Sequence, residues 1–289
     1  MLRIAVPNKG TLASPAAEML REAGYRQRTD QRDLVCRDEV NDVEFFYLRP
    51  RDIATYVGSG DLDLGITGRD LLVDAGSPAD ELLDLDFAGA SFRFAAHPST
   101  ITTVDQIAGR RVATSFPGVV NRYLADNGIA AEVIRLDGAV ENAIRLGVAD
   151  VVADVVETGA TLRQAGLAVI GDPILTSSAL LIGRDPTTDG RRGGAVATSA
   201  VAQLVRRLQG VLVARRYVML AYDVRADLLE QATMLTPGIE SPTVSPLHRE
   251  GWVAVEAMVL RSDVHKIMDE LYDLGARAIL VTGIHNCRL

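Results

Sequence analysis

The chain has 289 residues, of which 48% are hydrophobic and 24% charged, so it is long enough for two or three globular domains and disorder is not expected. Its 38 acidic and 30 basic residues give a formal net charge of −8, and no basic run carries interleaved aromatic residues, which argues against a nucleic-acid-binding surface. The two cysteines and four histidines lack metal-ligand spacing, which argues against a structural zinc site, and no apolar run approaches membrane-spanning length.

The N-terminal part of the chain predicts a strand, a loop and a helix. Residues 1–7 lack the longer apolar core of a signal peptide, so we expect a cytoplasmic protein. Residues 2–6 read as the strand, and residues 11–23 have the apolar spacing of the helix. Lys9 and Gly10 lie in the loop between them, where the Lys9 charge suits a pyrophosphate; a solvated lysine is the ordinary alternative.

A second strand is predicted at residues 43–48, and Pro50 then opens a helix that runs to Gly58. Arg49 lies between the two elements. A guanidinium can bind a phosphate or carboxylate through two parallel hydrogen bonds, so Arg49 is a candidate substrate ligand. A surface cap is the alternative interpretation.

Strand-like and helix-like segments continue to alternate, which favours α/β layers with largely parallel strands. Residues 60–70 give an apolar strand, a turn at Gly68 and a helix that begins near Asp70, and residues 147–159 repeat this pattern. Two such copies favour two similar lobes, each presenting a loop to a shared cleft. Asp70 is a candidate for orienting Lys9 or contacting a nucleotide, although a plain aspartate at a helix start is common.

The strongest candidate for a phosphate site follows a buried strand predicted at residues 151–156. The next turn is small and rich in hydroxyls, and it opens a helix whose unpaired N–H groups and dipole favour a phosphate. Asp154 and Glu157 would repel a bare phosphate but suit a ligand that carries sugar hydroxyls or Mg²⁺. The pattern predicts a ribose phosphate, with a merely capped turn as the alternative. The turn residues are Glu157, Thr158, Gly159, Ala160 and Thr161.

The C-terminal part of the chain follows a different pattern. A loop-like stretch at residues 183–194 precedes a helix predicted at residues 198–216. The order that follows, strand-helix-strand-strand-helix-strand, is that of a ferredoxin-like domain, which commonly carries regulation. The expected elements are strands 217–224, 241–247, 252–260 and 277–282 and helices 226–235 and 264–274.

Six motifs stand out together: VPNKG (6–10), LRPRDI (48–53), GITGRD (65–70), LDGAVE (136–141), DVVETGATL (154–162) and TPGIESPT (236–243). In combination they resemble the long form of the ATP phosphoribosyltransferase family, which acts first in histidine biosynthesis, over essentially the whole chain. The resemblance implies an α/β fold with a two-lobed, periplasmic-binding-protein-like catalytic core and a C-terminal ferredoxin-like (βαββαβ, ACT-like) regulatory domain. We expect lobe I at residues 1–90 and 184–214, lobe II at residues 91–183 and the regulatory domain at residues 215–289.

The implied reaction joins N1 of the ATP adenine to C1 of the ribose of phosphoribosyl pyrophosphate, giving N1-(5-phosphoribosyl)-ATP and pyrophosphate. Such chemistry depends on alignment and on stabilising the departing pyrophosphate more than on a strong base. The resemblance further implies a requirement for Mg²⁺, feedback inhibition by L-histidine, and a homohexamer able to exchange with a dimer.

The resemblance also assigns roles to individual residues. Lys9, Arg49, Glu141 and Asp154 are the expected catalytic residues, and Glu141 and Asp154 the expected magnesium ligands. Without the resemblance, Glu141 would read as an acidic residue at a helix start. Asp154 and the turn residues 157–161 are the expected ligands of phosphoribosyl pyrophosphate. The expected nucleotide ligands are Lys9, Gly10, Arg49, Gly68 and Asp70.

A histidine site is expected in the C-terminal domain. A free amino acid needs a carboxylate for its ammonium group and hydroxyl or backbone donors for its carboxylate. Without the resemblance, Asp223 and Ser241 would read as turn caps. The expected histidine ligands are Asp223, Ile239, Ser241, Thr243 and Ala278.

Two other functions share part of this pattern. A solute-binding module without chemistry would have the same two-lobed fold, but the missing export signal and the acidic phosphate loop argue against it. A phosphoribosyltransferase acting on a free base would share the loop, but not the C-terminal domain or the motif at residues 6–10. Competition by free adenine or orotate would distinguish these possibilities.

Overall fold

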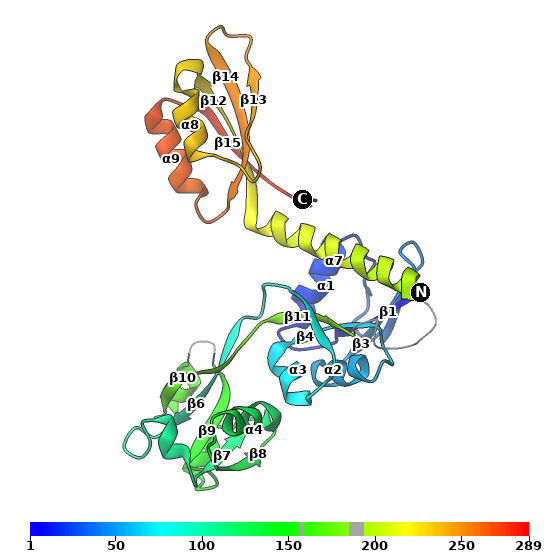
Figure 1. The fold of residues 1–289 in the computed structure, drawn as a ribbon, viewed down its shortest axis with the longest axis vertical. Helices are drawn as coiled ribbons and strands as arrows, with labels where there is room; N and C mark the ends of the chain where they lie inside the picture. Colours follow the sequence, from blue (N-terminus) through cyan, green and yellow to red (C-terminus); the bar gives the residue numbers. More distant parts are fainter. Residues whose placement is uncertain (157–158, 185–193, 289) are drawn as a thin grey trace. The chain divides into compact units, whose positions relative to one another are not determined.

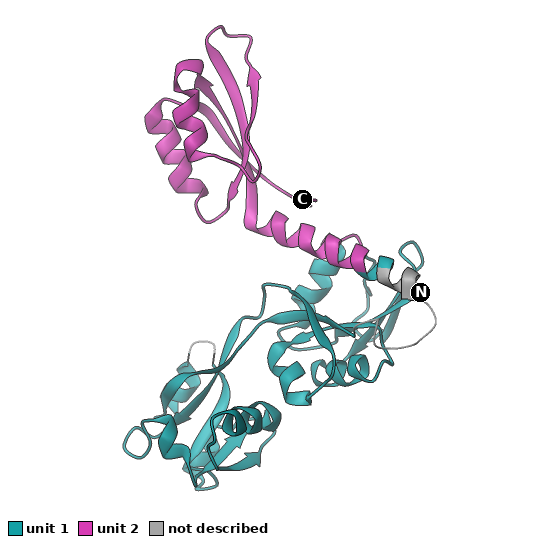
Figure 2. Cartoon of the chain, in the orientation of Figure 1, with its two compact units in different colours: residues 1–21, 25–201 teal, residues 22–24, 202–289 magenta. Residues whose placement is uncertain are grey.

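A computed structural model describes residues 1–156, 159–184 and 194–288 of the chain. The chain divides into two compact units (Figure 2): residues 1–21 and 25–201 form the first unit, and residues 22–24 and 202–289 form the second. Within the described ranges, no helix combines the length and the apolar character needed to cross a membrane. The lobe and domain bounds expected from the sequence stay predictions.

The first unit contains two lobes, each built on its own mixed sheet (Figure 1). The strands of lobe I are β1 (Leu2–Pro7), β2 (Val35–Asp38), β3 (Val43–Leu48), β4 (Leu64–Gly68), β5 (Asp80–Asp84) and β11 (Ala179–Gly183). They follow the order β2-β3-β1-β4-β11-β5. β1 pairs in parallel with β3 and β4, whereas β2, β5 and β11 run antiparallel to their neighbours.

Three helices accompany the strands of lobe I: α1 (Ala13–Glu22), α2 (Pro50–Gly58) and α3 (Arg69–Ala75). α2 begins at a proline and buries Ile53 and Val57 in a cluster that includes residues of β1 and β11. It approaches β4 so closely that a Cβ atom at Gly65 would lie 2.5 Å from Ile53 Cγ2. A side chain at Gly65 would therefore displace the helix from the sheet.

Lobe II has a second sheet of five strands. Its strands are β6 (Ala90–Ala96), β7 (Arg111–Thr114), β8 (Glu132–Arg135), β9 (Val151–Val156) and β10 (Ala168–Ser177), in the order β10-β6-β9-β7-β8. Phe92 and Phe94 of β6 are fully buried. The accompanying helices are α4 (Pro117–Asp126), α5 (Asn142–Arg145), α6 (Ala160–Gln164) and a 3₁₀ turn, η1 (Val104–Ile107).

The expectation of largely parallel strands is wrong, because antiparallel pairs are at least as frequent in both sheets. In lobe II, β7 is parallel to β8 and β9, but β6 is antiparallel to β9 and β10. The chain passes between the lobes twice, from β5 to β6 and from β10 to β11 (Figure 1). The strands that follow these connections, β6 and β11, run antiparallel to β9 and β4, and alternation along the sequence cannot reveal that direction.

The other elements expected from the sequence are confirmed in part. The strand expected at residues 151–156 is confirmed as β9, whereas the helix expected at residues 11–23 is shorter and spans α1. The short strands β2, β7 and β8 have four residues each and were not predicted. Four residues carry too little periodicity to stand out from a loop.

The lobes also touch where α3 of lobe I meets the start of α4 of lobe II. The Gly118 N–H donates to Asp74 Oδ1 at 2.8 Å, and Arg51 Nη1 donates to Asp74 Oδ2 at 3.2 Å. The Arg51 guanidinium carbon lies 4.5 Å from the centre of the Phe116 ring. A Cβ atom at Gly118 would lie 2.2 Å from the Asp74 carbonyl oxygen, so only glycine fits this contact.

The second unit confirms the ferredoxin-like order. Its elements are β12 (Tyr217–Arg225), a 3₁₀ turn η2 (Ala226–Leu228), α8 (Leu229–Leu235), β13 (Thr243–Pro246), β14 (Trp252–Leu260), α9 (Val264–Leu274) and β15 (Arg277–Gly283), preceded by α7 (Gly194–Arg216). The antiparallel sheet has the order β13-β14-β12-β15. Alternate residues of β12, such as Leu220 and Tyr222, are buried in one cluster with residues of α8 and α9. The Tyr222 and Thr236 hydroxyls share a buried 2.7 Å hydrogen bond.

We predict that Gly118→Ala lowers the free energy of unfolding by about 1–3 kcal/mol, because the added methyl group overlaps the backbone of Asp74. Helix propensity acts in the opposite direction, since alanine is the better helix former. Urea denaturation followed by circular dichroism measures the change. Asn121→Ala, at an exposed position of the same helix, is the matched control and should have little effect; an equal loss in both variants would contradict the prediction.

Candidate functional site

A cavity of about 240 Å³ lies between the two lobes of the first unit. Lobe I contributes the loop after β1 and the starts of α2 and α3, and lobe II contributes Phe116 and Val155. Both connections between the lobes also reach it. Four of the expected nucleotide ligands are therefore brought together. The lining residues are Lys9, Gly10, Thr11, Leu12, Pro50, Gly68, Asp70, Leu71, Ala88, Ala90, Phe116, Val155 and Ser177.

Asp70 is held at the cavity by Ser177, a residue that the sequence analysis missed. The Ser177 hydroxyl donates to Asp70 Oδ1 at 2.9 Å and accepts the Asp70 N–H at 3.1 Å. A Cβ atom at Gly68 would lie 2.2 Å from Asp70 Oδ1, so the glycine leaves room for the carboxylate. Because 107 positions separate Asp70 from Ser177, no local pattern could have indicated the pair.

The loop after β1 places Lys9 and Gly10 on the cavity wall. Gly10 has φ +79°, a left-handed conformation that favours glycine, and its carbonyl accepts the Ala13 N–H. Lys9 is exposed, so its ammonium group is free to reach an anion. Next to it, Asn8 Oδ1 is buried and has no hydrogen-bond partner among the described residues. A ligand that donates a hydrogen bond there would remove the cost of an unpaired acceptor.

Arg49 caps α2 at its N-terminus and is exposed. It does not line the cavity, unlike the neighbouring Pro50. Arg51, two residues further, was not among the expected residues although it contacts both Asp74 and Phe116. The signal for it in the sequence is that it is the second arginine of the same motif.

Asp154 is a carboxylate of the core whose pKa is raised. It lies on β9, next to the cavity residue Val155, and its Oδ1 accepts the Val155 N–H at 2.8 Å. Burial raises the pKa of Asp154, and the negative charge of Glu141 raises it further. The Val155 N–H and the charge of Arg51 act in the opposite direction without cancelling the effect. A carboxylate that is retained where its surroundings disfavour its charge is a candidate functional group.

Glu141 lies at the N-cap of α5, as expected, and its side chain makes no capping hydrogen bond. Its charge acts on Asp154, so the two carboxylates expected to bind Mg²⁺ do influence each other. Among the described residues, no group of three or more His, Cys, Asp and Glu side chains could hold a metal ion. Two carboxylates nevertheless fit Mg²⁺, which usually takes one or two of them and completes its shell with water and substrate phosphates.

Only part of the expected phosphate turn, residues 159–161, lies within the residues that the structure describes. Glu157 and Thr158 lie outside the described residues. Gly159 has φ +68° and caps the short helix α6, whose first residues Ala160 and Thr161 are exposed. This left-handed conformation favours glycine at the start of α6.

The expected histidine ligands fall into two groups in the second unit. Ile239, Ser241 and Thr243 line a cavity of about 350 Å³ together with the charged side chains Glu240, Glu256 and Arg288. Asp223 and Ala278 do not line it. Instead, Asp223 pairs with Arg277 in the sheet, and Ala278 follows in a left-handed conformation with φ +51° where the register of β15 shifts.

A larger cavity of about 400 Å³ lies at the β2 edge of lobe I, and none of the expected site residues lines it. Its arginines include Arg28, which is already engaged: it stacks over Tyr47 and donates to the carbonyl oxygens of Gln31 and Asp33. The smaller cavity between the lobes is the better candidate, because it gathers a lysine, an aspartate and residues of both lobes.

Comparison with known proteins gives two family matches that together cover most of the chain. The family described as ATP phosphoribosyltransferase matches residues 49–210, and the HisG C-terminal domain matches residues 214–286. An ATP phosphoribosyltransferase of Salinispora tropica is 71% identical over 289 residues, and one of Streptomyces coelicolor is 60% identical over 294 residues. Both alignments cover 100% of this chain and of the relative.

Among solved structures, the ATP phosphoribosyl transferase (HisG:HisZ) complex from Thermotoga maritima is similar, with a TM-score of 0.60 and 25% sequence identity. The similarity covers 72% of this chain and 99% of that one. The two-lobed α/β architecture is therefore shared with a protein of that name.

Asp154→Asn tests whether a functional carboxylate is retained at a cost in stability. The folded-state pKa of Asp154 is raised, so the cost is absent below its ordinary pKa, grows as the pH rises through the raised value, and is complete above it. We predict that the variant unfolds at a higher temperature than the unchanged protein at about pH 8, and that this gain shrinks as the pH falls. Turnover should fall at least about 100-fold, if the charge contributes to the transition state.

Asp150→Asn is a control for which we expect the opposite change in stability. Hydrogen bonds from Arg111 lower the pKa of Asp150, so its removal should destabilise the protein at neutral pH. Thermal unfolding of both variants across a pH series measures the two effects. A loss of stability in Asp154→Asn at neutral pH would contradict the prediction.

Proposed function

The chain belongs to the ATP phosphoribosyltransferase family, and from this premise we propose that it joins ATP to phosphoribosyl pyrophosphate at the cavity between its lobes. Membership of this family makes the protein a pentosyltransferase that acts in the first step of histidine biosynthesis. In the proposed reaction, the lone pair of adenine N1 forms a bond to ribose C1 as the bond from C1 to the pyrophosphate oxygen breaks. The products are N1-(5-phosphoribosyl)-ATP and pyrophosphate.

The observation that carries this proposal is the meeting of both lobes around one cavity that contains Lys9 and Asp70. We place part of ATP against Lys9, Gly10, Gly68 and Asp70, where the lysine charge offsets the phosphates. The cavity of about 240 Å³ is smaller than the roughly 300–1,000 Å³ of typical ligand sites, so only part of one substrate fits inside it.

Phosphoribosyl pyrophosphate is placed on the side of lobe II, along the end of β9 and the turn that follows. Asp154 would accept hydrogen bonds from the ribose hydroxyls and stabilise the positive character that develops at C1. Gly159, Ala160 and Thr161 would hold the ribose phosphate through backbone and hydroxyl donors. Glu157 and Thr158 belong to the same turn in this proposal.

Magnesium is proposed as the resident ion, held by Glu141 and Asp154. The repulsion between these carboxylates and the burial of Asp154 both raise the pKa of Asp154, and a dication would relieve both effects. When bound, the ion would neutralise charge on the pyrophosphate. Arg49 of lobe I is proposed as a cation for the leaving group, because it is exposed at the start of α2.

We further propose that the second unit binds L-histidine and inhibits the enzyme, that the enzyme is a cytoplasmic homohexamer able to exchange with a dimer, and that it acts without nucleic-acid or membrane partners. The 350 Å³ cavity supports the part of the histidine proposal that involves Ile239, Ser241 and Thr243, since it offers carboxylates, hydroxyls and an arginine to an amino acid. Asp223 is proposed as a further ligand from outside this cavity. The family assignment decides against the two alternatives, a solute-binding module without chemistry and a transferase for free bases.

The direct test is pyrophosphate release from ATP and phosphoribosyl pyrophosphate, with each substrate and Mg²⁺ omitted in turn and histidine added last. We expect release only when both substrates and the metal are present, and suppression by histidine. Mass spectrometry of the nucleotide identifies the product. Release with free adenine in place of ATP, or no release under any condition, would contradict the proposal.

For regulation, we predict that Asp223→Ala raises the histidine concentration needed for half inhibition at least about tenfold, because a ligand ammonium group would lose its charged partner. Turnover with saturating substrates should stay within about twofold, since the second unit is a compact body of its own. Asp227→Ala is the matched control: Asp227 is an exposed aspartate of the same unit, paired with Arg225. Unchanged inhibition in Asp223→Ala would exclude this residue from the site.

A further inference from the structure

The second connection between the lobes carries adjacent serines that act on opposite sides of the strand. Ser177 is 5% exposed and lines the cavity, where it makes the two hydrogen bonds to Asp70 described above. Ser178, the next residue, points away from it because successive residues of an extended chain face opposite sides. Its hydroxyl donates to Asp84 Oδ2 at 2.6 Å.

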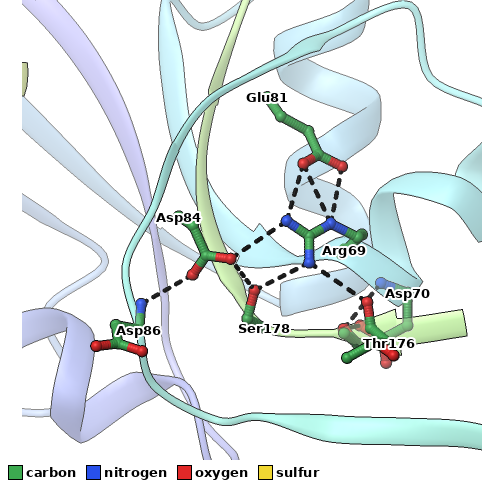
Figure 3. A network of polar contacts seen from close by, with 8 residues as sticks. Arg69, Asp70, Glu81, Asp84, Asp86, Thr176 and Ser178 are labelled. Carbon is green, nitrogen blue, oxygen red and sulfur yellow. Dashed lines mark hydrogen bonds and ion pairs between the residues drawn. The ribbon is translucent and has the colours of Figure 1, made fainter.

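Arg69 connects this strand to lobe I (Figure 3). Its backbone N–H donates to the Ser178 carbonyl at 3.0 Å, and its guanidinium reaches Ser178 Oγ at 3.2 Å and the Thr176 carbonyl at 3.3 Å. The other guanidinium nitrogens bind Glu81 at 3.0 and 3.1 Å and Asp84 at 3.3 Å. One side chain therefore joins the start of α3 to β5 and to the end of β10.

In this cluster, one guanidinium, that of Arg69, faces the two carboxylates of Glu81 and Asp84. Burial opposes the ionisation of Asp84, but hydrogen bonds from Ser178, the Asp86 N–H and Arg69 outweigh it and lower the pKa of Asp84. The Glu81 carboxylate raises the pKa of Arg69. An ion pair joined by several hydrogen bonds fixes geometry better than a single surface pair.

We propose that Ser177 is a positioning residue that fixes the Asp70 carboxylate toward bound ATP, and that the Arg69–Asp84–Ser178 cluster holds Ser177 in place. The inference rests on the proposed function, in which Asp70 contacts the nucleotide. Gly68 carries no side chain that could brace Asp70, since even a Cβ atom there would lie 2.2 Å from Asp70 Oδ1. The serine hydroxyl is the group that limits rotation of the carboxylate, because it bonds both the side chain and the backbone of Asp70.

The test is a double-mutant cycle between Ser177 and Asp70, read as separate KM values for the two substrates. Ser177→Ala should raise the KM for ATP about tenfold and leave the KM for phosphoribosyl pyrophosphate within about twofold, because a misplaced ligand weakens only its own substrate. In an Asp70→Ala background, Ser177→Ala should have no further effect, since the serine acts through the aspartate.

Ser59→Ala is the matched control, because the Ser59 hydroxyl also bonds a carboxylate, Asp61 Oδ2 at 2.6 Å, but lies away from the cavity. It should leave both KM values unchanged. Thermal unfolding of each variant separates folding from positioning. Should Ser177→Ala fail to fold, Ser178→Ala replaces it, and loosening of the cluster should raise the KM for ATP about threefold in the same selective way.

Equal changes in both KM values, or full additivity with Asp70→Ala, would overturn the positioning role while leaving the enzyme assignment intact. Absence of pyrophosphate release by the unchanged protein would overturn the proposed function and this inference with it. The two failures are therefore distinguished by the activity of the unchanged protein.

Discussion

The candidate site depends on the double passage of the chain between the two lobes. The link from β5 to β6 brings Ala88 and Ala90 to the cavity, and the link from β10 to β11 brings Ser177. These links also set the sheet topology, because the strands that follow them, β6 and β11, run antiparallel to the parallel strands β9 and β4. A two-lobed enzyme needs such connections to hold binding groups from both lobes around one reacting centre.

Electrostatics distinguish structural carboxylates from the candidate functional one. Asp150 and Asp84 are held by Arg111 and Arg69, and their pKa values are lowered as hydrogen bonds stabilise the charged form. The pKa of Asp154 moves the other way, because burial and Glu141 both disfavour its charge. In the proposed function, a metal ion and ribose hydroxyls would complete the environment of this carboxylate and offset the cost of its charge.

In the second unit, the helices pack on one face of the sheet, and the sheet residues that line the 350 Å³ cavity lie mainly on the other face. One face of its sheet is buried under α8 and α9, and the 350 Å³ cavity is lined by residues such as Met219 and Glu256 that alternate with the buried ones. The proposed reaction and the proposed histidine binding thus belong to separate compact units.

Local elements and family membership can be inferred from the amino-acid sequence alone. Periodicity and turn chemistry over a few residues predict strand β9, the start of α2 at a proline, the ferredoxin-like order and the turn at Gly159. The six motifs identified the family that the comparisons later confirmed.

Only the tertiary structure decided the direction of the connecting strands, the partnership of Asp70 with Ser177, and the separation of Asp223 from the cavity at Ile239, Ser241 and Thr243. The physical reason is that these features depend on pairing between segments far apart along the chain. Side-chain spacing encodes which face of an element is apolar, but it does not encode which distant segment lies beside it.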